Sequence, residues 1–187
     1  MKRVLITYAT REGQTEKIAH YLREHLSSSG AKVTLVNASD AAMLEKLNLS
    51  AFELLVFGAS LHAGSLEREM LDFLQHHSPQ IGAKNRSFFL VLLSAAATDP
   101  EKRQAWLADA RHKVQQKLPV QFTDFEMIAG ALAYSRYSFP VRWMMKRIAR
   151  QAGHLEETPR DHEFTDWDQV TRYAQRLLSA LEESQSE

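Results

Sequence analysis

The sequence predicts one α/β domain with a five-stranded parallel sheet that is covered by helices on both faces. Short apolar runs alternate with longer segments of helical periodicity. Most of these runs are nearly continuous in apolar residues, as is typical of strands buried on both faces. The chain of 187 residues is long enough for one domain with a substantial core. Because crossovers between parallel strands are right-handed, this repeated β-α order predicts a doubly wound sheet, with 2-1-3-4-5 as the leading strand order.

Five apolar segments are the strand candidates: Arg3–Ala9, Lys32–Asn37, 53–59, 87–94 and 125–132. Apolar stripes at helical spacing begin at Ile18, Leu66, Leu107 and Val170 and predict four helices. Thr165 and Asp168 have the spacing of a capping box at the start of the last helix. Between the second and third strands the pattern is weaker, and AAMLEKLNL predicts one short helix. The whole chain, 1–187, is therefore expected to be a single domain.

The composition excludes several classes of function. The 23 Lys and Arg balance the 23 Asp and Glu, so no global field attracts nucleic acid. The absence of cysteine removes disulfides, thiolate metal sites and a cysteine nucleophile. No two histidines stand at i, i+4, so no metal site is expected. The sequence lacks a signal peptide and any apolar run of about 20 residues, which predicts a cytoplasmic protein that is soluble or peripheral to a membrane.

The loop after the first strand, TREGQT, is a candidate phosphate site. It consists of Thr10, Arg11, Glu12, Gly13, Gln14 and Thr15. Two hydroxyls, a permissive glycine and the free N–H groups of the next helix suit a phosphate. The loop lacks the Walker A lysine and the GxGxxG spacing, which favours a monophosphate over a nucleoside triphosphate or a dinucleotide. The alternative is that both threonines only cap the helix and that the glycine only makes the turn.

Two further loops are expected at the same edge of the sheet. After the third strand come Ser60, Leu61 and His62, and after the fourth come Ser94, Ala95, Ala96 and Ala97. Small side chains there leave room for a flat ring, and backbone amides can bond its edge. The alternatives are that Thr98, Asp99 and Pro100 make an ordinary helix start and that His62 is a plain loop residue.

Together these three loops resemble the phosphate and ring loops of the flavodoxin family, which binds FMN. Four stretches, ITYATREGQTEKIAHYL, VFGASLHAG, IAGALAYSRY and TDWDQV, resemble in order and spacing the flavodoxin-type, quinone-dependent protoporphyrinogen IX dehydrogenases of bacterial haem biosynthesis. The resemblance implies a flavodoxin-like fold and FMN contacts at the residues of the three loops. It also implies oxidation of protoporphyrinogen IX to protoporphyrin IX, with a membrane quinone, menaquinone or ubiquinone, as the electron acceptor.

Two features favour an enzyme over an electron carrier. The chain is neutral, and its ring loops offer no aromatic side chain, whereas carrier flavodoxins are acidic and often stack the flavin between aromatic rings. A less enclosed flavin is easier to reduce by two electrons. The alternatives are an NAD(P)H:quinone reductase, a flavodoxin-type electron carrier and a flavin-free binding module. No residue pattern assigns a catalytic side chain, and the oligomeric state, a homo-oligomer included, is left open.

A helical insertion of about residues 133–163 interrupts the expected order after the fifth strand. Its first part holds Tyr134, Arg136 and Tyr137, which are candidate substrate contacts because they offer aromatic faces for a tetrapyrrole and a guanidinium for a carboxylate. The alternative is that the tyrosines pack at a hinge and the arginine is solvated.

The second part of the insertion predicts a basic amphipathic helix that starts near Pro140. Residues 127–155 contain no acidic residue. The candidates to face a membrane or a partner are Arg142, Trp143, Lys146, Arg147 and Arg150. Such a basic face can meet anionic lipid or the propionates of a porphyrin. The alternative is that the apolar stripe packs on the domain and the cations are solvated.

Overall fold

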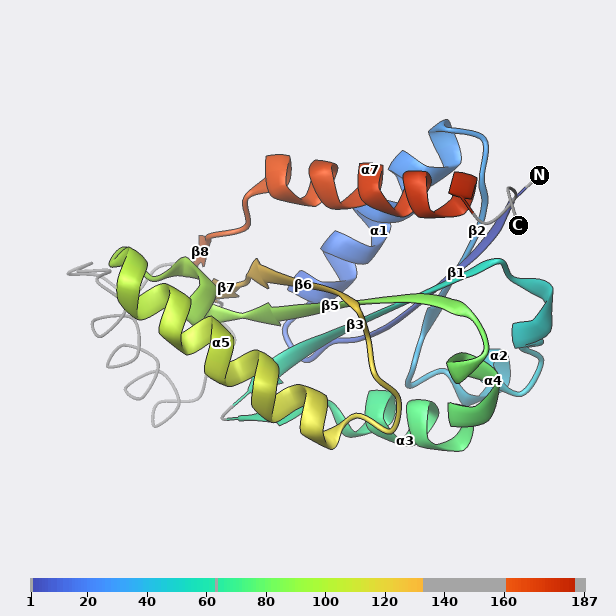
Figure 1. The fold of residues 1–187 in the computed structure, drawn as a ribbon, viewed down its shortest axis with the longest axis horizontal. Helices are drawn as coiled ribbons and strands as arrows, with labels where there is room; N and C mark the ends of the chain where they lie inside the picture. Colours follow the sequence, from blue (N-terminus) through green and yellow to red (C-terminus); the bar gives the residue numbers. More distant parts are fainter. Residues whose placement is uncertain (1, 63, 133–160, 184–187) are drawn as a thin grey trace.

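The computed structural model describes residues 2–62, 64–132 and 161–183, and its centre is a parallel sheet (Figure 1). The five long strands are β1 (Arg3–Ala9), β2 (Lys32–Asn37), β3 (Leu54–His62), β5 (Asn85–Leu92) and β6 (Asp124–Ala129). They pair in parallel in the order β2-β1-β3-β5-β6. Counted over the long strands this is the order 2-1-3-4-5, so the predicted doubly wound, flavodoxin-like α/β fold is confirmed.

Helices cover both faces of the sheet, as Figure 1 shows. One face carries α1 (Gln14–Ser28) and α7 (Trp167–Glu183), and the other carries α2 (Ala41–Leu44), α3 (Arg68–His76), α4 (Ser78–Gly82) and α5 (Pro100–Lys117). Each strand sends alternate side chains into two separate cores. On β1, Leu5 lies in the core beneath α3 and α5, whereas Val4 and Ile6 lie in the core beneath α1 and α7. This division explains why the strands are apolar at successive positions.

Several boundaries differ from the predictions. Strand β3 continues to His62 and turns back into the short β4 (Ser65–Leu66). The fourth strand ends at Leu92, where a 3₁₀ turn, η2 (Leu93–Ala96), begins. The second crossover is not one helix over AAMLEKLNL but the single turn of α2 followed by a 3₁₀ turn, η1 (Leu49–Ala51). The helix signal was weak there because the segment offers little apolar periodicity.

The predicted capping box of α7 is wrong. The carboxylate of Asp166 accepts the N–H groups of Asp168 and Gln169 at 2.9 and 3.1 Å, so Asp166 caps the helix. The hydroxyl of Thr165 instead donates to the carbonyl of Ala129 at 2.7 Å. A hydrogen bond to the sheet has therefore displaced the local bond that the sequence pattern predicts.

The fifth strand is also shorter than predicted. After β6 ends at Ala129, β7 (Ala131–Leu132) pairs antiparallel with β8 (His162–Glu163), and this pair marks where the chain leaves and re-enters the described structure. Residues 133–160 lie outside the described residues. The candidate substrate contacts Tyr134, Arg136 and Tyr137, and the basic segment from Arg142 to Arg150, therefore remain sequence predictions.

A buried polar network joins α7 to the sheet. The hydroxyl of Tyr173, which is fully buried, lies 2.5 Å from the hydroxyl of Ser87. Ser87 in turn donates to the carboxylate of Asp124 at 2.5 Å, and Arg176 lies 3.5 Å from the same carboxylate. Burial raises the pKa of Tyr173, and the hydrogen bond to Ser87 opposes that shift. The tyrosine therefore stays neutral and packs as a hydrogen-bonded core residue.

Replacing Tyr173 with phenylalanine is expected to lower the free energy of unfolding by about 1–2 kcal/mol, because the change removes one buried hydrogen bond and leaves the Ser87 oxygen without the donor that Tyr173 supplies. Urea denaturation measures the loss. Tyr21→Phe is the matched control, because the Tyr21 hydroxyl also bonds a hydroxyl, that of Thr171 at 2.8 Å, but at a half-buried position that water can reach. An equal loss in both variants would contradict the account of the network.

Candidate functional site

The candidate site lies where the parallel strands end at the carboxyl edge of the sheet. The strand order reverses beside β1, and ligands of open α/β sheets bind at such a switch point. The register places Ala9 of β1 opposite Ala59 of β3, and Ser60 opposite Val91 of β5. Residues 10–15 and 93–97 follow β1 and β5, and residues 60–62 end β3 between them, so all three stretches lie at one edge. The structure brings the three predicted loops together.

The TREGQT loop makes a tight turn into α1. Gly13 is the N-cap residue with φ 94°, a left-handed conformation that suits glycine, and no side chain caps the helix. Thr10 accepts the N–H of Gly13 at 2.9 Å and so stabilises the turn before the helix. Thr15 caps nothing. The interpretation of both threonines as helix caps is wrong, and no side chain of the described residues accepts the first amides of α1.

Unpartnered buried atoms single out this edge. In the described part of the chain, three buried side-chain polar atoms have no hydrogen-bond partner: Oγ1 of Thr7, Oγ1 of Thr15 and Nε2 of His62. Leaving such a group unpaired costs about 1–3 kcal/mol. Two of the three, those of Thr15 and His62, belong to the predicted cofactor loops. This pattern fits a site whose polar groups are completed by a ligand.

Gln14 has a different role from the one predicted for the loop as a whole. Its side-chain amide donates to the hydroxyl of Thr165 at 2.8 Å and ties the start of α1 to the segment before α7. Beside it, Lys17 bonds the carboxylate of Glu163 at 2.9 Å. The side-chain nitrogen of Gln14 is therefore bonded within the protein.

The loop after β5 combines a ring-loop candidate with an ordinary helix start. Ser94 to Ala96 are half-buried in the turn η2, whereas the side chain of Ala97 is buried in the protein. The carboxylate of Asp99 accepts the N–H groups of Glu101 and Lys102 at 3.1 and 3.2 Å. The interpretation of Thr98, Asp99 and Pro100 as an ordinary helix start is confirmed. Ser94 to Ala96 are the part of the loop that a ring can contact.

Glu67, which no sequence pattern singled out, joins two of the loops. Glu67 is only 7% exposed and precedes α3. Its carboxylate accepts the hydroxyl of Ser60 at 3.1 Å and pairs with Arg11 at 3.3 Å. The hairpin of β3 and β4, which pairs Leu61 with Leu66, returns the chain to this point. Gly64, with φ 77°, was the available signal for that hairpin.

Tyr8 supports the loop from the end of β1. Its hydroxyl donates to the carboxylate of Glu16 in α1 at 2.8 Å. Burial, together with the hydrogen bond and charge of Glu16, raises the pKa of Tyr8 to about 12. Tyr8 is therefore neutral at physiological pH and serves as a hydrogen-bond donor.

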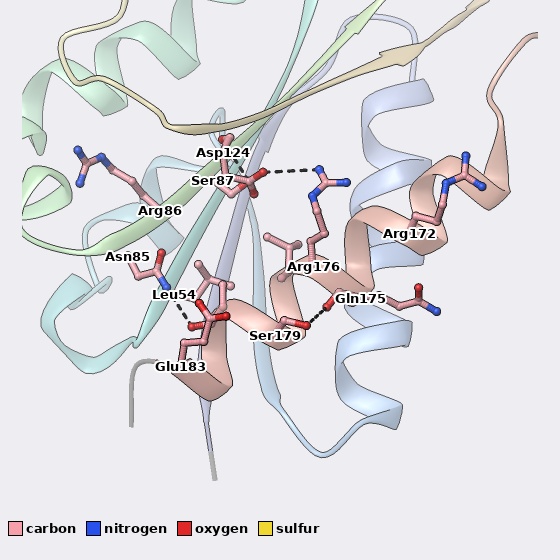
Figure 2. Close-up of a pocket in the computed structure, with 12 residues that line it drawn as sticks. Leu54, Asn85, Arg86, Ser87, Asp124, Arg172, Gln175, Arg176, Ser179 and Glu183 are labelled. Carbon is pink, nitrogen blue, oxygen red and sulfur yellow. Dashed lines mark hydrogen bonds and ion pairs between the residues drawn. The ribbon is translucent and has the colours of Figure 1, made fainter. Parts of the chain in front are cut away.

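A groove of about 620 Å³ lies at the opposite, amino-terminal edge of the sheet, between α7 and the starts of β3, β5 and β6 (Figure 2). Its arginines already bond protein groups. Arg86 donates to the carbonyl of Gln121 at 2.9 Å, Arg172 pairs with Asp166, and Arg176 pairs with Asp124. The groove is at the wrong edge for the ligand of a doubly wound sheet.

The described residues offer neither a cluster of metal ligands nor a helix that spans a membrane. They contain no group of three or more His, Cys, Asp or Glu side chains that could hold a metal ion. None of the helices in these segments has the length and apolar character needed to cross a bilayer.

Comparisons with known proteins agree with the geometry. The family model described as Flavodoxin domain matches residues 5–158. Protoporphyrinogen IX dehydrogenase [quinone] of Escherichia coli (strain K12) is 29% identical over 175 residues, which cover 94% of both chains. The Leishmania major protein of the same name is 25% identical over 171 residues, 91% of this chain and 72% of its own.

Among solved structures, the flavodiiron protein from Giardia intestinalis superposes with a TM-score of 0.51 at 10% identity, covering 98% of this chain and 38% of that one. This likeness concerns the fold alone. The resemblance that the four sequence stretches indicate is confirmed by the named relatives. Because the family model matches most of its length, the chain belongs to the flavodoxin domain family.

Proposed function

We propose that this protein binds FMN at the carboxyl edge of β1, β3 and β5 and oxidises protoporphyrinogen IX to protoporphyrin IX, with a quinone as the electron acceptor. The main observation in favour of FMN binding is a pair of unpartnered buried atoms, Thr15 Oγ1 and His62 Nε2, at that edge. The names of the Escherichia coli and Leishmania major relatives support the substrate and the acceptor.

The residues of the three loops fit the parts of FMN. The N–H groups at the start of α1 and the hydroxyl of Thr15 would hold the phosphate, where the helix dipole favours negative charge. Residues 60–62 and 94–96 would line the ring. When bound, FMN supplies the two-electron chemistry. The chain itself then has to orient the substrate and move protons.

Three rounds of oxidation remove the six hydrogens by which the substrate and product differ. We assign Tyr134, Arg136 and Tyr137 to the substrate on the strength of their chemistry, since a flat tetrapyrrole with carboxylates suits aromatic faces and a guanidinium. In the sequence these residues come shortly after β7, which itself follows β6, the last strand of the parallel sheet. The haem biosynthetic role follows from the same proposed reaction.

A turnover assay tests the proposal. FMN-loaded protein is mixed with protoporphyrinogen IX and a water-soluble quinone, and porphyrin fluorescence is followed. Without oxygen and with the substrate in excess over the protein, we expect porphyrin fluorescence to rise beyond the amount that the bound flavin alone can produce only when both FMN and quinone are present. Faster flavin reduction by NADPH than by protoporphyrinogen would instead identify an NAD(P)H:quinone reductase. A stable one-electron-reduced flavin without turnover would identify an electron carrier, and failure to take up FMN would leave a flavin-free binding module.

We also propose that the basic segment holds the protein at the inner face of the cell membrane, close to its quinone. Changing its four cations together to glutamine is expected to weaken binding to anionic vesicles about tenfold or more, because each contributes about 1 kcal/mol before screening. The variant carries Arg142→Gln, Lys146→Gln, Arg147→Gln and Arg150→Gln.

Vesicle co-sedimentation measures the effect of the four substitutions. The matched control changes four exposed cations elsewhere on the chain to glutamine: Lys32, Arg68, Lys102 and Lys113. Equal binding by the two variants would show that net charge alone acts, and would refute the membrane role of this segment.

A further inference from the structure

Each two-electron oxidation of a porphyrinogen removes a hydride from carbon and a proton, which comes from nitrogen in two of the three rounds and from a meso carbon in the other. The proton needs an acceptor near the ring loops. In the described parts of the phosphate loop and the two ring loops, the titratable side chains are Arg11, Glu12 and His62, and Glu67 lies against them. Histidine is the side chain whose ordinary titration suits proton exchange near pH 7.

His62 is held between two carboxylates. Its Nδ1 lies 3.9 Å from Oε1 of Glu12 in the phosphate loop, and its Nε2 lies 3.7 Å from Oε1 of Glu67. The Nε2 atom is buried and makes no hydrogen bond within the described residues. Both distances exceed a direct hydrogen bond, so a small movement or one water completes each contact.

Glu67 is itself fixed in place. Ser60 donates to Oε1, the oxygen that faces His62, and Arg11 pairs with Oε2. The side chain of Glu67 is 9% exposed, whereas that of Glu12 is 19% exposed. One side of the imidazole thus faces a fixed, buried carboxylate, and the other faces a carboxylate nearer to solvent.

We propose that His62 is the proton-accepting residue of this site, that Glu67 is the residue that positions it, and that Glu12 passes the proton to solvent. The inference rests on the proposed function. In each round a C–H bond of the substrate breaks with its electron pair going to the bound flavin. A proton also leaves the substrate, from nitrogen in two rounds and from a meso carbon in the third, and goes to Nδ1 of His62, while the buried Nε2 keeps its hydrogen facing Glu67. The imidazolium then releases the proton from Nδ1 to Glu12, so charge and hydrogen balance.

Single-turnover bleaching of the flavin by protoporphyrinogen tests the relay at pH 7. We expect His62→Gln to bleach about 100-fold more slowly, since general base catalysis contributes about 10²–10⁴-fold. The thermal stability of the FMN-free variant is expected to stay within a few degrees of that of the parent protein, and bleaching is compared with both proteins saturated with FMN. His112→Gln, at an exposed position on α5, is the matched control and is expected to bleach at the parent rate.

Rescue separates a proton-transfer role from a structural one. Added imidazole is expected to restore much of the bleaching rate to His62→Ala and none to Glu67→Gln, whose own loss of about tenfold comes from misplacing His62. Parent-like bleaching by His62→Gln would overturn the proposal, and so would a lack of rescue in an FMN-loaded His62→Ala protein.

A quinone distinguishes failure of the relay from failure of the proposed substrate. Reduction of a quinone takes up one hydride and one proton, so the relay acts in reverse when the dithionite-reduced protein is reoxidised anaerobically by a water-soluble quinone. His62→Gln is expected to slow this step about tenfold or more. Suppose that the variant is reoxidised slowly but that protoporphyrinogen does not bleach the flavin of the parent protein. This result would support the proton relay and refute protoporphyrinogen as the substrate. Equal reoxidation rates would refute the relay.

Discussion

Replacing Thr15 with valine is expected to weaken FMN binding roughly 10- to 100-fold without destabilising the FMN-free protein. The Thr15 hydroxyl is fully buried and has no partner among the described residues. A bond to a phosphate is a hydrogen bond to a charged group, worth about 1.5–3 kcal/mol, and each 1.4 kcal/mol is tenfold in Kd. Valine has nearly the same shape as threonine, so the FMN-free protein loses only an unsatisfied polar group.

Quenching of FMN fluorescence measures the affinity, and urea denaturation without FMN measures the stability. Thr7→Val is a closely matched control, because Thr7 is also fully buried with an unpartnered hydroxyl but lies within β1. Its FMN affinity is expected to match that of the parent protein. Unaltered affinity in Thr15→Val would contradict the assignment of the phosphate, as would an equal loss of affinity for riboflavin, which has no phosphate.

The second large effect concerns stability. Gly58→Ala is expected to lower the free energy of unfolding by about 3 kcal/mol or more, because a Cβ at this position would lie 2.0 Å from Cζ of Phe89. Phe89 is fully buried and packs edge-on against Tyr173, with ring centroids 6.2 Å apart, so its ring has little room to move.

Urea denaturation again gives the measurement. Gly82→Ala is the matched control, since a Cβ there meets nothing within 4 Å. Its stability is expected to stay within about 0.5 kcal/mol of the parent protein. A similar loss in the two variants would show that Phe89 does not restrict position 58.

The layered fold follows from patterns that act over a few residues. Val56 and Phe57 are both fully buried, yet they belong to opposite cores, and a strand with such neighbours has to be covered on both faces. Once the strands and crossovers are recognised, right-handed connections leave little choice of strand order. This is why the topology could be predicted without side-chain detail.

The local caps were harder to predict because tertiary contacts compete with them. Thr165 fits the capping pattern, but its hydroxyl finds the carbonyl of Ala129, which is distant in sequence. Asp166 then caps α7 in its place. Short-range patterns contain no information about such a distant acceptor.

The site was predictable at the level of loops but not of side-chain partners. Topology alone brings residues 10–15 and 60–62 to one edge. The burial of Glu67 instead depends on a hairpin that folds β4 back along β3, and charged residues are seldom buried without a partner. The partner, Arg11, lies 56 residues earlier in the chain, so their meeting could not be inferred from spacing.

Anaerobic titration of the FMN-loaded protein with protoporphyrinogen IX tests the central claim most directly. The visible absorbance of the oxidised flavin is followed together with porphyrin fluorescence. The account predicts that the flavin bleaches and that about three flavins are reduced for each protoporphyrin IX formed, since six hydrogens leave in two-electron steps. A flavin that stays oxidised in the presence of excess protoporphyrinogen IX would contradict it.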